Sequence, residues 1–196
     1  MKTQNTFFKQ ITKLGLLLMM ALAMTACGAG SIKWDEEIQL SDGKIIVIER
    51  QAIYVSGGAE WASNPSGSKI NEDRIQFEYP VGTGQKVEWR TIKKDLKTYP
   101  EIPLVFDVYS GLPTIYSLMP ISLACEVYSK YVYKNGAWVE ELLPEQFEQH
   151  TSNLLFASMK NLPALLKLAE KNKRNDDIGH RRALYQTGPN RKVCGE

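Results

Sequence analysis

The sequence predicts a mainly β protein of the α+β class, an antiparallel sheet folded as a sandwich or curled sheet, with C-terminal helices packed on it. Two dipeptides that favour tight hairpin turns, Asp42-Gly43 and Asn135-Gly136, each lie between apolar runs. Apolar and polar residues alternate over Arg74–Tyr79, as in a strand with one buried face. After about residue 143 the apolar spacing becomes helical, which places the helices at the C-terminal side.

The first predicted hairpin joins strands 34–40 and 45–54 through a type I′ turn at Asp42-Gly43. Ile45–Ile48 is apolar without alternation, which predicts a strand covered on both faces. Residues 56–73 are rich in Gly, Ser, Asn and charge, so we expect a long surface loop there.

The remaining strands are predicted from the same signals, apolar runs bounded by turn residues. Strands are predicted over 74–79, 87–92, 102–109, 112–118, 125–133 and 137–142. Ser110-Gly111 and Asn135-Gly136 provide two of the turns. Pro113 predicts that its strand lies at an edge or begins at a bulge, because proline cannot donate a ladder hydrogen bond.

The C-terminal quarter, about 144–173, is predicted to be helical. Pro144 suits the first turn of a short helix, and Thr151 or Ser152 could cap a second helix. After Pro163, the leucines of Ala164–Lys173 form an apolar stripe that we expect to pack on the sheet. A polar tail follows.

The N-terminus has the layout of a secretory signal peptide. Lys2, Lys9 and Lys13 precede the uncharged run Leu14–Met24, which is shorter than the about 20 residues of a membrane-spanning helix. Small residues then lead to Cys27.

Met24-Thr25-Ala26-Cys27 resembles the lipobox of bacterial lipoproteins, with methionine where leucine is commonest. The resemblance implies cleavage before Cys27, a diacylglycerol on its thiol and acylation of its new amino group. It divides the chain into a signal peptide (1–26), a lipidated tether (27–33) and one domain (34–196). Gly28 is not the aspartate that retains such proteins in the inner membrane, so the resemblance favours the outer membrane, facing the periplasm. The alternative is an ordinary signal peptide cut after Ala26.

The charge of the body is nearly balanced. The chain has 24 basic and 22 acidic residues, and the three lysines of the leader account for the basic excess. The body therefore lacks the excess of basic residues that would most simply indicate nucleic-acid binding. The stretch Lys171–Glu196 is basic, which predicts either a solvated tail or one that touches anionic lipid.

Two cysteines remain beside Cys27. In an oxidising periplasm Cys125 and Cys194 are candidates for a disulfide, and the alternative is two unpaired thiols.

The residues that could support catalysis form no recognised motif. His150 and His180 lie outside any metal-binding spacing, so we expect no metal and no cofactor. Gly82–Lys86 is interpreted as a turn and not as a phosphate loop. In Trp34–Glu37, Asp35 and Glu37 would share one face of a strand and Glu36 the other. These carboxylates either serve acid–base chemistry on glycans or form a solvated, charged strand edge.

Aromatic residues are the candidate ligand contacts. Trp61 lies in the predicted long loop, and Tyr131 and Trp138 lie in the last hairpin. Exposed aromatic faces stack on sugars or pack on partner proteins. Cross-strand packing inside the sheet is the alternative.

The expected function is a membrane-anchored, periplasm-facing lipoprotein that binds an envelope protein or glycan without catalysis. The alternatives are an envelope hydrolase acting on glycan or peptide, and a phage- or plasmid-borne surface protein that blocks a receptor. The patterns Trp-Asp-Glu-Glu, Leu-x-Asp-Gly and Asn-Gly-x-Trp also resemble those of uncharacterised bacterial envelope or phage-borne proteins, a resemblance that implies no activity.

Overall fold

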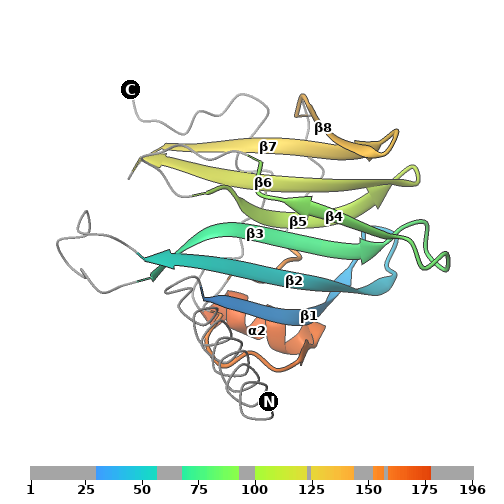
Figure 1. Ribbon diagram of the computed structural model, residues 1–196. Helices are drawn as coiled ribbons and strands as arrows, with labels where there is room; N and C mark the ends of the chain where they lie inside the picture. The colour runs from blue at the N-terminus through green and yellow to red at the C-terminus, as the bar shows by residue number, and fades with distance from the viewer. Residues whose placement is uncertain are drawn as a thin grey trace, which may run out of the picture.

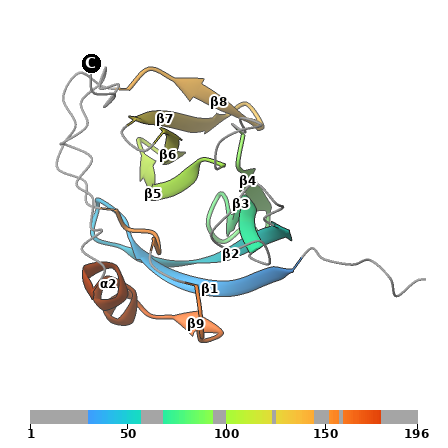
Figure 2. The same ribbon diagram turned by 90° about the vertical axis from the view of Figure 1, so that its left-hand side faces the viewer.

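Two largely antiparallel sheets face each other and form a sandwich (Figures 1 and 2). The computed structural model describes residues 30–56, 68–92, 100–122, 125–143, 152–156 and 159–177. The mainly β, antiparallel class predicted from hairpin turns and alternation is confirmed.

The first sheet has five strands. In spatial order they are β4 (Lys86–Arg90), β3 (Ser68–Glu78), β2 (Ile45–Ser56), β1 (Ser31–Gln39) and β9 (Leu165–Leu166). β9 is a two-residue strand that pairs in parallel with β1, and the other pairs are antiparallel.

The second sheet has four strands in sequence order. They are β5 (Ile102–Tyr109), β6 (Leu112–Ser122), β7 (Cys125–Lys134) and β8 (Ala137–Glu141). The core between the sheets is apolar and centres on Trp89, Phe106 and Tyr131, with Phe77 and Phe106 packed edge to face at 4.6 Å between ring centroids.

Four hairpin turns whose residues the structure describes lie at one end of the sandwich, which we call the turn end (residues 41–44, 80–85, 110–111 and 135–136; Figure 1). The opposite end, which we call the Ser31 end, contains Gly30–Lys33, Tyr54–Val55, Lys69–Ile70 and the turn Lys160–Asn161. Strand register places Ser31 opposite Ile53 and Val55 opposite Lys69.

The tight turn predicted at Asn135-Gly136 has the type I′ backbone that Asn-Gly favours, with φ of 54° and 81°. The turn predicted at Ser110-Gly111 is also present, and both of its central residues have positive φ, 50° and 79°. The type I′ turn predicted at Asp42-Gly43 is wrong although the hairpin is present. There Gly43 N–H donates to Leu40 C=O at 2.9 Å, and among the turn's central residues only Gly43 has positive φ. This is a three-residue loop that ends in a left-handed glycine.

Three further strand predictions need correction. Residues 68–73 are the first half of β3 and not loop, because this polar strand pairs with β2 along its length. β6 is a central strand, and Pro113 is tolerated because pairing with β7 begins only at Thr114. Ile45 and Val47 are 55% and 52% exposed, so β2 is not covered on both faces at this end.

The predicted C-terminal helices are only partly correct. Residues 144–151 lie outside the described residues, and 152–156 are not helical. Leu154 packs in the core between the sheets, whereas Leu155 joins a second cluster with Trp34, so successive side chains diverge as in extended chain. The helix α2 begins later than expected, at Leu168, and ends at Asp177.

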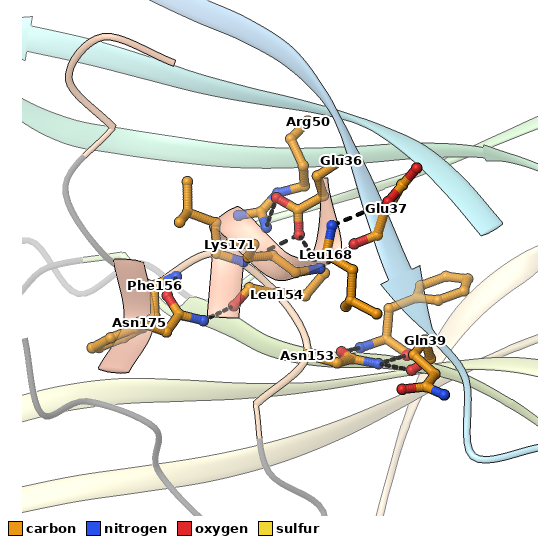
Figure 3. Close-up of polar contacts among 12 residues, drawn as sticks. Glu36, Glu37, Gln39, Arg50, Asn153, Leu154, Phe156, Leu168, Lys171 and Asn175 are labelled. Atoms are coloured by element: carbon orange, nitrogen blue, oxygen red, sulfur yellow. Dashed lines mark hydrogen bonds and ion pairs between the residues drawn. The ribbon is translucent and has the colours of Figure 1, made fainter. Parts of the chain in front are cut away.

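The C-terminal strap (residues 152–156 and 159–177) spans the gap between β1 and β5 (Figure 3). The Asn153 side chain accepts from Phe106 N–H at 2.9 Å and donates to Phe106 C=O at 2.7 Å and Gln39 C=O at 3.0 Å. Leu154 N–H donates to Leu104 C=O at 3.2 Å. One amide side chain thus pairs with strand edges from both sheets.

Replacing Asn153 with alanine should lower the free energy of unfolding by about 2–3 kcal/mol, because the buried backbone of Phe106 loses its partners. Urea titration followed by tryptophan fluorescence measures the change. Asn172→Ala is the matched control, because Asn172 is half-buried on α2 and the structure shows no hydrogen bond from its side chain to another described residue. Equal stability of the two variants would contradict the bridging role of Asn153.

Candidate functional site

A cluster of four charged side chains is buried beside the strap. Glu36, Arg50, Asp73 and Lys171 are each at most 1% exposed. Three of them lie on the inward face of neighbouring strands β1, β2 and β3. Register pairs Trp34 with Arg50 and Ala52 with Asp73, so both carboxylates are diagonal neighbours of Arg50.

Arg50 occupies the centre of this row. Its Nη2 lies 3.3 Å from Asp73 Oδ1 and its Nη1 lies 3.6 Å from Glu36 Oε2. Its guanidinium stacks over the Trp34 ring at 5.2 Å from the centroid. Asp73 is fixed further by Thr91, whose hydroxyl accepts from Asp73 N–H at 2.9 Å.

Glu36 connects the sheet to the strap. Its Oε2 accepts from Trp34 Nε1 at 2.9 Å, and its Oε1 accepts from Leu155 N–H at 3.1 Å. Lys171 Nζ, which comes from α2, lies 3.6 Å from the same Oε1 (Figure 3). Lys171 Nζ also donates to Glu37 C=O.

Glu37 and Asn175 complete the attachment of α2. Glu37 Oε2 accepts from Leu168 N–H at 3.1 Å, which places a carboxylate at the N-terminus of the helix. Asn175 donates to Leu154 C=O and accepts from Phe156 N–H, both at 3.0 Å. Lys171 and Asn175 are one helical turn apart, so the buried face of α2 is polar.

Burial changes the protonation of this cluster. It lowers the pKa of Lys171 to about 8, against the opposing effect of Glu36. Burial likewise raises the pKa of Asp73, although Arg50 favours its charged form. The side chains are closed off from solvent, so the cluster can hold the strap in place but cannot present a carboxylate to a substrate.

A second buried carboxylate, Glu101, connects the two sheets. Its Oε2 accepts from Ser117 Oγ at 2.8 Å and from Tyr131 OH at 3.0 Å, and its Oε1 accepts from Ile92 N–H at 2.7 Å. Desolvation, followed by the charge of Glu101, raises the pKa of Tyr131.

The three aromatic residues predicted to contact a ligand have different outcomes in the structure. Tyr131 is 1% exposed, so the prediction that it presents a face to a ligand is wrong, and cross-strand packing describes it instead. Trp138 is half-buried against Phe77 and Tyr133, and its Nε1 donates to Glu88 C=O at 2.9 Å. It therefore joins β8 to β4 across the sandwich. Trp61 lies outside the described residues.

The predicted carboxylate facing is confirmed, since Asp35 is exposed, Glu36 is buried and Glu37 is half-buried. The solvated-edge interpretation is wrong for Glu36, because the strap covers it. Lys171 is likewise not part of a solvated tail. Sequence reasoning missed this cluster, although its signal was present as charged residues at inward positions of alternating strands.

The cysteines and histidines singled out in the sequence lie largely outside the part of the chain that the structure describes. Cys27, Cys194, His150 and His180 lie outside the described residues, as does the side chain of Cys125, whose backbone opposite Ser122 begins β7. Within the described ranges, no group of three or more His, Cys, Asp or Glu side chains is placed to hold a metal ion.

Comparison with protein-family models, curated proteins and solved structures found no match to this chain. None of the helices in the described part of the chain has the length and apolar character needed to span a membrane.

The free energy of unfolding should rise with pH in a way that depends on Lys171. Its pKa of about 8 in the folded protein is below the value near 10.5 of the unfolded chain. Between these values the unfolded state binds more protons, so stability increases as the pH rises through this window. The expected gain between pH 8 and pH 10 is about 2 kcal/mol relative to Lys171→Met.

Urea titrations of the native protein and Lys171→Met over this range measure that difference. Lys173→Met is the control, because Lys173 is exposed on the same helix and should leave the pH dependence of the native protein unchanged. Parallel pH curves for the native protein and Lys171→Met would show that burial does not perturb this ammonium group.

Proposed function

We propose that this protein is a lipid-anchored β-sandwich of the bacterial cell envelope that faces the periplasm, with the outer membrane as its location. The single observation that carries the anchor is Met24-Thr25-Ala26-Cys27 at the end of a short apolar run. The strand β1 begins at Ser31, four positions after the proposed anchor residue Cys27.

We infer that the body binds a partner and does not catalyse a reaction. The three neighbouring carboxylates that could support hydrolysis have separate structural settings: Asp35 lies on the outer face, Glu36 is held under the strap, and Glu37 contacts the N-terminus of α2. They do not converge on one point, as a pair of glycosidase carboxylates must.

The turn end supplies apolar surface for such a partner. Val81 is 79% exposed, and Ile45 and Val47 are 55% and 52% exposed near the same end. Apolar side chains that remain in water on a folded protein are suited to contact with another envelope protein.

The anchor is tested by mass spectrometry of the mature protein purified from membranes. The expected N-terminal residue is Cys27 with a thioether-linked diacylglycerol and an acylated amino group. Cys27→Ser should abolish the modification, whereas Cys125→Ser should retain it. An unmodified thiol on Cys27 would overturn this assignment.

The binding role is tested by photo-crosslinking in intact cells with p-benzoylphenylalanine at position 81. One discrete protein adduct is expected there, because Val81 is the most exposed aliphatic side chain of the turn end. The same group at position 165, which is 38% exposed on β9, provides the control. The same adduct at both positions, or at neither, would contradict a partner at the turn end.

A further inference from the structure

The chain between the proposed anchor and the sandwich is very short. Gly30 is already fixed, because its C=O accepts from Tyr54 N–H at 2.8 Å. The expected tether of residues 27–33 is therefore shortened, since β1 begins at Ser31. Only Gly28 and Ala29 separate Cys27 from this fixed position. Three Cα–Cα steps span at most roughly 11 Å.

That length is comparable to the polar layer of a membrane. A bilayer is about 40–45 Å thick with a hydrocarbon core of about 30 Å, which leaves roughly 5–8 Å of headgroups on each side. Acyl chains on Cys27 would lie in the hydrocarbon core, so its backbone would lie among the headgroups. The two intervening residues can therefore carry Gly30 no more than a few ångströms beyond this layer.

Basic side chains flank the position where the chain joins the sheet. Lys69 is half-buried on β3, opposite Val55, and Lys160 is exposed on the strap side of β1. Lys33 on β1 is 57% exposed and pairs with Glu49 at 2.7 Å. Lysine near an anionic bilayer surface is attracted to it.

We propose that the Ser31 end of the sandwich rests on anionic phospholipid headgroups, with Lys69 and Lys160 in contact with them and the turn end directed away from the membrane. This inference rests on the lipid anchor proposed for Cys27. It assigns a membrane-facing surface to the folded body in addition to the anchor.

Two lysines on opposite ends of the first sheet provide a matched test. Lys69 lies opposite Val55 at the Ser31 end, and Lys44 immediately precedes β2 at the turn end. Lys44 is eleven positions before Val55, a separation of roughly 35 Å at about 3.3 Å per residue of strand. The full lipidated protein, with p-benzoylphenylalanine at position 69 or 44, is placed in phosphatidylethanolamine–phosphatidylglycerol vesicles and irradiated.

Covalent phospholipid adducts are expected at position 69, and no such adducts are expected at position 44. Equal adducts at both positions, adducts only at position 44, or none at either would overturn the inference.

Lys160→Glu should lower the adduct yield at position 69, and an unchanged yield would overturn the role of the lysines. Mass spectrometry of Cys27 on the same sample separates the two proposals: an acylated Cys27 without adducts at position 69 rejects only this inference, whereas an unmodified Cys27 rejects the anchor itself.

Discussion

The docking of the strap depends on the ion pairing of Glu36 with Arg50 and Lys171. Removing a charged group from water costs several kcal/mol even after relaxation of the protein, so each buried charge needs close partners. Glu36 receives two cations and two N–H donors, and the four-residue cluster has two charges of each sign. Without Lys171 and Leu155, Glu36 would lose half of these contacts. The sheet and the strap therefore stabilise each other through a polar contact.

The strap also supplies hydrogen-bond partners to backbone groups at exposed strand edges. Unpaired N–H and C=O groups on an edge strand promote pairing with other chains. Here the side chain of Asn153 pairs with β1 and β5, and Lys171 binds the C=O of Glu37. On the opposite side, Trp138 of β8 donates to β4. Side chains thus close the sandwich where strands do not pair.

The sequence predicts the hairpins well because their signals are local. Asn135-Gly136 determines its turn through the positive φ of two adjacent residues, and the apolar face of Arg74–Tyr79 determines which side is buried. The strap could not be predicted in the same way. Its leucines suggest an apolar helix, yet Leu154 and Leu155 enter different clusters, and α2 is held by Lys171 and Asn175.

The candidate site was equally difficult to predict, for the same physical reason. A charged residue on a strand is usually solvated, and only its partners show that it is buried. Glu36 has the expected facing, but its burial depends on Lys171, which lies 135 positions away in the chain. Tyr131 is an aromatic residue of a type common in binding sites, but its hydroxyl donates a hydrogen bond to the buried carboxylate of Glu101. Local spacing can place a charged residue on the inward face of a strand, but it does not show which distant residue will pair with it.

The arrangement of the two ends links the fold to the proposed role. In the β1–β2, β3–β4, β5–β6 and β7–β8 pairs, short turns place each connection at the end opposite Ser31. An anchor close to Ser31 would direct this end into the periplasm. Tight turns with defined backbone angles lose little conformational freedom when a partner binds, so less of the interaction energy is spent on ordering them. An end with short turns and the exposed aliphatic side chains of Val81, Ile45 and Val47 is better suited to contacting a preformed protein surface than to enclosing a small substrate.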